Sequence, residues 1–481
     1  MEFKNYFKYL WKTMDRNLKT LGIVTRPQAG NGLWLSCLLP LCYMISTGKM
    51  YKQVGFDYKI STIICFGLMV QSVGIFIRLM SEKSSFIFNV ITKFLPGAFS
   101  SFLVWICLKQ TEIFSMICGF GTTIIYDFMY LYVMKVLPKS FTLGEGAIVM
   151  QGVSLFLFNA FLQLPSHYVK YETLIGELNI MKPVLQIGLL GLLIMIVMIH
   201  FVPLLRKWIL FYPLLLSFVG LMIAIPDPKN VPQIYTLIDF MTKDNERMLI
   251  ILIFALLVAM AVLTVAFFTV KNLQSSTSVR KIFHVLIICV FVPGIIYQCT
   301  LLFVASVLML AVFITLEIIR VIDLPPFSSI LNTAVSTFLD EKDAGLIALT
   351  PIYLLIGCSL PLWIHPVPCD LTDSGGLEIL KLFSGILSVG VGDMAASVIG
   401  SRFGKHKWRN SIKSVEGTLG SILFQILAVG GLWMLKLIHL NYLKILYTGV
   451  AIIVNALIEA KTDQVDNLML PLITFAILSL A

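Results

Sequence analysis

The stretch VGVGDMAASVIG, residues 389–400, places one carboxylate among small residues at the end of a long apolar run. A helix over this stretch has two neighbouring strips with a spacing of four residues, formed by Gly392, Ala396 and Gly400 and by Asp393 and Ser397. Small residues let a second backbone or a ligand come close to a helix. The pattern fits either tight helix packing, with Asp393 satisfied at the membrane interface, or a ligand site at that interface.

The loop that follows, GSRFGKHKWRNSIKSVEGT at 400–418, is rich in glycines and cations. Glycines permit close backbone approach, and successive N–H groups in such turns cradle anions. Lys and Arg neutralise phosphate oxygens, while Mg²⁺ takes one or two carboxylates together with substrate phosphates. Asp393, Lys413 and Glu416 therefore predict a magnesium–nucleotide site. The alternative is that the basic loop only sets the membrane topology.

Three further loops carry polar, mostly ionisable residues near apolar runs. They are 275–284 with Arg280, Lys281 and His284; 320–345 with Asp340, Glu341 and Asp343; and 459–467 with Glu459, Asp463, Asp466 and Asn467. In phosphoryl transfer the protein mainly positions and neutralises, and a carboxylate can take the acceptor proton. Known nucleotide motifs are missing from the sequence: it has no GxxxxGK[ST] loop and no protein-kinase signature. The loose GxGxxA match at 390–395 ends an apolar helix, which excludes a Rossmann reading.

The elements that position these residues are membrane spans. Of the 481 residues, 58% are hydrophobic and 13% charged, whereas soluble domains carry about 25% charged residues. We expect an all-α, polytopic transmembrane helical bundle of about fifteen spans, since each span needs about 20 apolar residues. The candidate windows are 33–48, 60–80, 86–108, 115–136, 145–164, 183–203, 208–225, 248–270, 282–299, 300–319, 344–364, 379–400, 418–437, 442–458 and 466–481.

The order of spans and loops predicts that the four polar loops share one side of the membrane. Two windows separate each of these loops from the next, so all four face the same way. The loop 400–418 is strongly basic, which makes that side cytosolic by the positive-inside rule, and the opposing loop 365–376 has no Lys or Arg. We divide the chain into an N-terminal transmembrane region, 1–270, and a C-terminal catalytic region, 271–481.

Several other features favour structural roles. Asp127 and His200 lie inside apolar runs, where an ionisable group is a functional candidate by default. We favour a structural role for both, either at a helix end near the headgroups or in a satisfied interhelical hydrogen bond. The nine cysteines lack paired spacing, which predicts free thiols. The N-terminus, 1–26, has no compact apolar centre and no small-residue cleavage site, so it is not a cleavable signal. The net charge of +10 comes without a basic tract interleaved with aromatics, which excludes nucleic acid as a partner.

The C-terminal 200 residues resemble the dolichol kinase family. Five blocks carry the resemblance in order: SVRKIFH (278–284), LDEKDAGLIALTPIYLLIG (339–357), SGILSVGVGDMAASVIGSRFG (384–404), KSVEGT (413–418) and IEAKTDQVDNLMLPL (458–472). Shorter forms of the pattern occur in phytol kinases and CTP-dependent diacylglycerol kinases, and the arrangement is distantly similar to phosphatidate cytidylyltransferases. The N-terminal spans resemble the family only in hydropathy and number.

The resemblance implies a multi-pass endoplasmic-reticulum enzyme that transfers the γ-phosphate of CTP to the terminal hydroxyl of dolichol, giving dolichyl phosphate and CDP for protein glycosylation. It implies CTP-binding positions at Gly390, Gly392, Asp393, Ala396, Ser397, Gly400, Arg402, Gly404, Lys413, Ser414, Gly417 and Thr418. Asp393, Glu416 and Asp343 are the candidate catalytic residues, with Asp393 and Glu416 on Mg²⁺ or another divalent cation. Arg280, Lys281, His284, Asp340, Glu459, Asp466 and Asn467 are further candidates.

Other functions remain open at this point. The nearest alternative is another CTP-dependent lipid enzyme, acting on phytol or diacylglycerol or transferring a cytidylyl group. A membrane transporter is the alternative from a different class, although the charged residues gather in loops on one face rather than at the midplane. The sequence allows an oligomer but does not indicate one.

Overall fold

The computed structural model describes residues 2–82, 85–169, 176–226, 231–271, 277–338, 342–373, 379–409 and 411–481. Within these ranges the chain is helical, and its β pairing is limited to two isolated bridges, Pro226–Pro232 and Lys407–Ser414. This confirms the all-α prediction. The predicted site residue Asp340 and its neighbour Glu341 lie outside the described residues.

All fifteen predicted windows fall on helices. In the first part of the chain these are α2 (Leu38–Lys49), α3 (Phe56–Met80), α4 (Phe86–Leu108), α5 (Glu112–Val136), α6 (Leu143–Val169), α7 (Glu177–Phe201), α8 (Trp208–Ala224) and α10 (Asn245–Val270). In the second part they are α12 (Ile282–Tyr297), α13 (Cys299–Val321), α15 (Thr350–Ile364), α18 (Met394–Phe403) with the segments before it, α19 (Val415–Met434), α20 (Tyr442–Lys461) and α21 (Asp466–Leu478). Ten of the described helices are long and apolar enough to cross a membrane, and α8, α12, α15 and α21 are shorter apolar helices.

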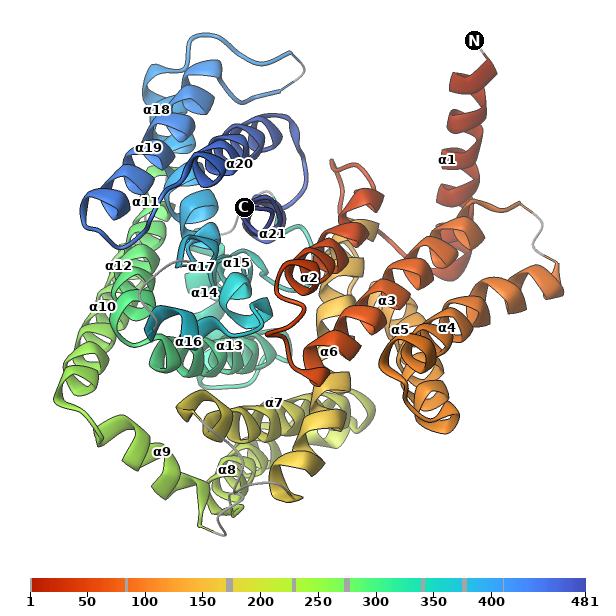
Figure 1. The fold of residues 1–481 in the computed structure, drawn as a ribbon, viewed down its shortest axis with the longest axis horizontal. Coiled ribbons are helices and arrows are strands. Elements are labelled where there is room, and N and C mark those ends of the chain that lie inside the picture. The colour runs from red at the N-terminus through yellow and green to blue at the C-terminus, as the bar shows by residue number, and fades with distance from the viewer. Residues whose placement is uncertain are drawn as a thin grey trace.

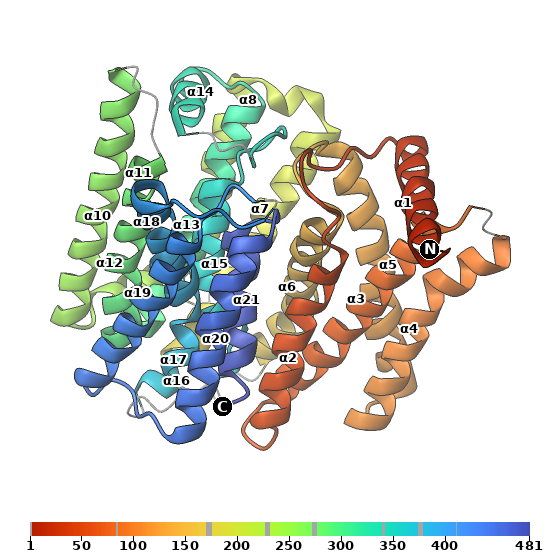
Figure 2. The ribbon, with the colours of Figure 1, turned by 90° about the horizontal axis from the view of Figure 1, so that it is seen from above.

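The helices form two groups that meet along α2 and α21 (Figures 1 and 2). The first group contains α1 (Glu2–Leu21) to α6, and the second contains α10 to α21. Helices α7, α8 and the short α9 (Gln233–Thr242) lie along one edge in Figure 1 and continue the chain from one group to the other.

The predicted polar loop 320–345 contains a further helix, α14 (Phe327–Phe338). Its apolar residues Ile330, Leu331, Ala334, Val335 and Phe338 recur at helical spacing, which gives one apolar face. At twelve residues α14 is too short to span a bilayer. The prediction of a loop over 320–345 missed this amphipathic helix, because polar and apolar residues alternate along its sequence.

The predicted single helix over 379–400 is divided into three segments. It begins as α17 (Ile379–Leu382), continues as a π-helical segment η4 (Ile386–Asp393), and ends as α18. The Ser388 hydroxyl donates to the Ser384 carbonyl at 2.7 Å within this run. Wide π turns inside helices occur often at functional sites. Here the π segment ends at Asp393.

The prediction of free thiols is wrong for two cysteines. Cys299 at the start of α13 and Cys369 in α16 (Pro368–Asp373) form a disulfide, although 70 residues separate them. The pairing follows from the helical hairpins, which return both residues to the end of the bundle opposite the four polar loops. Spacing along the chain cannot reveal such a pair.

The two ionisable residues inside N-terminal spans have interhelical partners, which is one of the two structural roles expected for them. Asp127 on α5 accepts a hydrogen bond from the Gln71 side chain at 2.8 Å and pairs with Arg78, both on α3. The Nε2 atom of His200 lies 2.7 Å from the Tyr132 hydroxyl. These contacts join helices within the N-terminal region.

A buried ion pair joins the N-terminal helices to the loop between α20 and α21. The Arg26 guanidinium donates to Glu145 at 2.6 Å and to the Asp463 carbonyl at 3.1 Å. The same Glu145 oxygen accepts the Val465 amide at 2.9 Å. Both charged side chains are almost fully buried, with 4% and 1% exposure. The loop at 462–465 is therefore held by residues that lie more than 300 positions earlier in the chain.

Candidate active site

The four polar loops meet at one large cavity of about 1170 Å³. Its lining includes residues of all four loops: Arg280, Lys281 and His284 from the first, Arg320 and Asp343 from the second, Ser401, Lys407, Lys413 and Ser414 from the third, and Glu459, Asp466 and Asn467 from the fourth. This arrangement agrees with the parity argument, which placed all four loops on one side. The cavity is the candidate active site.

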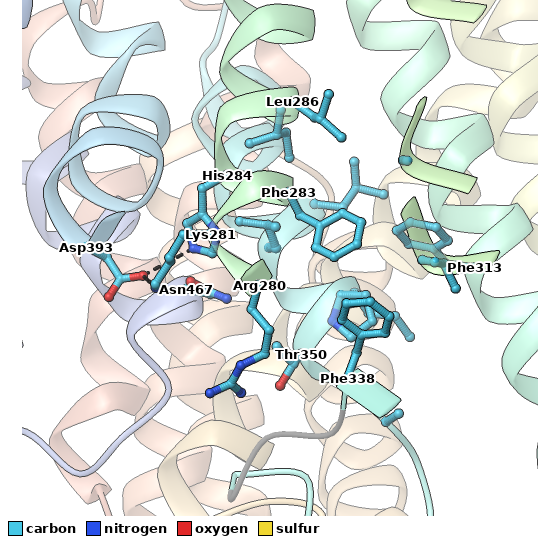
Figure 3. A pocket seen from close by; sticks show the side chains of 18 of the residues that line it. Arg280, Lys281, Phe283, His284, Leu286, Phe313, Phe338, Thr350, Asp393 and Asn467 are labelled. Atoms are coloured by element: carbon cyan, nitrogen blue, oxygen red, sulfur yellow. Dashed lines mark hydrogen bonds and ion pairs between the residues drawn. The ribbon is translucent and has the colours of Figure 1, made fainter. Parts of the chain in front are cut away.

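Asp393 lies at the polar end of the cavity, where the π segment gives way to α18 (Figure 3). Its Oδ2 atom accepts the Lys281 ammonium at 2.5 Å and faces the His284 Nε2 atom at 3.2 Å. Asp393 is only 4% exposed, so its charge depends on these partners. The sequence predicted Lys281 and His284 as site candidates, and the structure brings both to the central carboxylate.

Two more lysine–carboxylate pairs lie in the same part of the protein. Lys413 Nζ contacts the Glu459 carboxylate at 2.5 Å, and Lys342 Nζ contacts the Asp466 carboxylate at 2.7 Å. With Lys281–Asp393 they form three pairs, which we call the lysine–carboxylate cluster. Nearby, the buried Nδ1 atom of His284 has no hydrogen-bond partner among the described residues, and the same holds for the Oδ1 atom of Asn467. Buried polar atoms without partners are uncommon in proteins and mark places where a ligand or water can bind.

The glycines of the central motif hold helices close together. A side chain at Gly417 would place its Cβ 2.7 Å from the Ala396 carbonyl oxygen, and one at Gly404 would place its Cβ 2.6 Å from the Ser414 hydroxyl. Ser414 begins α19 by accepting the Gly417 amide at 3.1 Å. This close contact between α18 and α19 brings the backbone to the cavity, because Ala396, Ser397, Gly400, Ser414, Gly417 and Thr418 all line it.

Other predicted residues lie beside the cavity rather than in its lining. Gly390 packs against Ile288 and Gly392 against Gln425. The Glu416 carboxylate accepts the His406 amide at 3.1 Å and contacts its ring Nδ1 at 2.6 Å, which fixes the turn before α19. Of the predicted nucleotide-binding positions, Gly390, Gly392, Arg402 and Gly404 are outside the lining, and so is Glu416.

Asp343 lies in the lining and caps a helix. Its Oδ1 atom accepts the amides of Leu349 at 2.8 Å and Thr350 at 3.1 Å, at the start of α15. Beside it, Arg320 donates to Glu317 at 2.5 Å, and Glu317 accepts the Ala348 amide at 2.7 Å. We did not single out Glu317 or Arg320 in the sequence. Their spacing of three residues at the end of an apolar run is typical of an ion pair on one helix face, and this pattern could have identified them.

The remaining walls of the cavity are apolar. Phe283, Phe313 and Phe338 face it from α12, α13 and α14, on the other side of Figure 3 from Asp393. Helix α10 supplies a long stripe, which consists of Phe254, Leu257, Val258, Ala261, Val262, Val265, Ala266, Thr269 and Val270. The cavity is therefore charged at the loop end and hydrocarbon-like along its depth.

Outside the spans, one carboxylate of the loop 462–465 has a shifted pKa. Partial burial would raise the pKa of Asp463, but hydrogen bonds from the Gln464 side chain and the Gly30 amide lower it below its ordinary value. The Gly30 amide lies 2.6 Å from the Asp463 Oδ2 atom. Asp463 is thus a further contact between the N-terminal region and this loop.

Comparison with known proteins shows the family of the chain. A family model described as "Dolichol kinase" matches residues 8–354. The chain is 30% identical to the dolichol kinase of Homo sapiens over 426 residues, covering 85% of this chain and 78% of that protein. It is 30% identical to the dolichol kinase of Mus musculus over 490 residues, covering 97% and 89%. A dolichol kinase of Saccharomyces cerevisiae is 28% identical over 203 residues, covering 42% and 36%.

No solved structure matches the chain. The family match includes most of the N-terminal region, where the sequence showed a likeness only in hydropathy and number of spans. The match also agrees with a nucleotide-dependent lipid kinase embedded in a membrane by many helices. On these comparisons, the chain belongs to the dolichol kinase family.

Proposed function

We propose that the cavity binds CTP at its charged end and dolichol along its apolar depth, and that the γ-phosphate passes between them where the two parts meet. The observation that carries this proposal is the continuity of one cavity from the lysine–carboxylate cluster to the apolar stripe of α10. A polyisoprenol can stay in a hydrocarbon environment while its hydroxyl reaches a polar rim. CTP reaches the same rim from water.

The lysine–carboxylate cluster suits a nucleotide that arrives with a divalent cation such as Mg²⁺. On binding, Lys281 and Lys413 would turn to the phosphate oxygens, and Asp393 would share the cation with them, because Mg²⁺ in such sites takes one or two carboxylates plus phosphates. Among the described residues no three His, Cys, Asp or Glu side chains gather as a ready-made ligand set. That arrangement favours a cation bound jointly by protein and nucleotide.

In the proposed reaction the dolichol oxygen forms a bond to the γ-phosphorus, and the bond from that phosphorus to the β–γ bridging oxygen breaks. CDP leaves with the bond's electron pair, and the hydroxyl proton passes to a carboxylate. Asp343 lines the cavity and is our candidate for this acceptor. Glu416 would have to break its hydrogen bonds with His406 before it could act as a base or a metal ligand. We therefore propose that Glu416 has a structural role, in which it stabilises the turn that positions Lys413 and Ser414.

We further propose that residues 271–481 form the catalytic region of an endoplasmic-reticulum enzyme whose polar loops face the cytosol. The basic residues of the loop 400–418 support this orientation through the positive-inside rule. The Cys299–Cys369 disulfide supports it from the other side, because disulfides persist in oxidising compartments such as the reticulum lumen.

The test uses purified protein with Mg²⁺, dolichol and CTP labelled either at the γ-phosphate or at the α-phosphate. Label reaching the lipid only from the γ position is expected. Label from the α position would mean cytidylyl transfer and would overturn the proposal. Replacing dolichol with phytol or diacylglycerol, and CTP with ATP or GTP, would identify the acceptor and donor. A folded sample that transfers neither label would favour a transporter.

A further inference from the structure

The apolar part of the cavity has a defined depth, and we infer that it holds only the first few isoprene units of the lipid acceptor, about five. This inference rests on the proposed function, because it takes the acceptor hydroxyl to lie at the lysine–carboxylate cluster. It adds a tail-binding site with a length limit.

The depth follows from the stripe on α10. Lining residues extend from Val270, near the charged end, to Phe254, sixteen residues earlier. At a rise of 1.5 Å per residue this stripe is about 24 Å long, most of the roughly 30 Å of a bilayer's hydrocarbon core. The lining also includes the apolar residues Leu302 and Phe291, and at the charged end it includes Lys281 and Lys407.

The number of isoprene units follows from bond geometry. Three covalent bonds separate successive Cα atoms at 3.80 Å, so the four-bond isoprene repeat extends about 5 Å. A cavity about 24 Å deep therefore accommodates about five repeats. Pockets for drug-sized ligands are about 300–1,000 Å³. At about 1170 Å³, this cavity exceeds what a nucleotide alone requires but cannot enclose a much longer polyisoprenoid.

The walls suit a branched, unsaturated chain. Phe283, Phe313 and Phe338 present ring surfaces beside the charged end, where the first units would lie. Deeper along the cavity, aliphatic residues such as Leu286 and Ala261 line the walls together with Phe254 and Phe291. Because lipid tails are as apolar as these walls, the gain on entering comes from close dispersion contacts rather than from leaving water.

The experiment measures phosphorylation of isoprenoid alcohols of two to eleven units in detergent. We expect kcat/KM to rise roughly threefold per added unit up to about five units and then to stay level, since wall contacts supply the gain. Ala261→Trp should plug the stripe about halfway, leaving short acceptors unaffected and ending the rise near three units. Leu263→Trp is the matched control, because Leu263 is on the same helix, 67% exposed and outside the lining.

The outcomes separate this inference from the proposed kinase activity. Transfer that is equally efficient for all lengths, or a rise that continues to eleven units, would overturn the length limit while leaving the kinase intact. An identical length profile in Ala261→Trp and Leu263→Trp would also overturn it. Failure of every isoprenoid alcohol to accept phosphate would instead refute the proposed function.

Discussion

Replacing Glu145 with Gln tests whether the N-terminal region positions part of the active site. Glu145 neutralises Arg26 and accepts the Val465 amide, and residue 466 begins the helix that brings Asp466 and Asn467 to the cavity. Removing one partner of a buried pair costs about 3–5 kcal/mol because the other charge stays buried. We expect about 3 kcal/mol, at the lower end of this range, since Arg26 keeps its bond to the Asp463 carbonyl.

The assay compares thermal unfolding in detergent with kinase turnover per folded molecule. Asp127→Asn is the matched control, because Asp127 is also buried against an arginine and its partners Gln71 and Arg78 both lie in the N-terminal region. Both variants should unfold at lower temperature. Only Glu145→Gln should also lose kcat, with faster amide exchange in the peptide that contains Val465. Equal turnover per folded molecule in the two variants would refute a positioning role.

Three more predictions concern the site and the adjoining loop. Asp393→Asn should lower turnover roughly a hundredfold or more while the protein stays folded, because it removes the charge that would face the proposed cation; near-normal activity would refute the assignment. Gly417→Ala should destabilise the protein by about 1–3 kcal/mol, measured by thermal unfolding, since its Cβ meets the Ala396 carbonyl oxygen at 2.7 Å; unchanged stability would contradict the packing role. The pKa of Asp463 in the folded state lies below its ordinary value of about 3.9, so the ionised carboxylate stabilises the folded state at pH values above about 3.9. This stabilisation is lost as the pH falls through the lower pKa of the folded state. Between about pH 5 and 3 the parent should therefore lose stability more steeply than Asp463→Asn, and parallel melting curves would exclude the effect.

The sequence predicted the topology well because alternation of apolar runs and polar loops is a local property. Counting spans was enough to place the loops of Lys281, Asp343, Lys413 and Asp466 on one side, and the structure brings them to one cavity. The sequence did not predict which charges would pair. Lys342 and Asp466 are 124 positions apart, so only the packed helices bring them together.

Other features escaped prediction for distinct physical reasons. Glu416 contacts His406 and does not line the cavity, because the turn before α19 brings His406 next to it. The KSVEGT motif does not specify the shape of that turn. The Cys299–Cys369 pair required knowing which helix ends adjoin. Helix α10 is apolar on every side, so its sequence cannot distinguish the face toward the cavity from the face toward lipid.

The position of Asp393 suits the proposed reaction, in which one substrate comes from water and the other from the membrane. A carboxylate deep in the bilayer would be costly to ionise, and one far out in water would not meet a hydroxyl whose chain stays in hydrocarbon. At the end of the π segment, Asp393 is buried yet paired with Lys281, so it can stay charged without water. The small residues of α18 and α19 keep these two helices close, since larger side chains would separate them, and in the proposed site they would let the backbone approach the nucleotide. In the proposed reaction, the same residues that allow close helix packing would thus let charged groups react at the edge of the membrane.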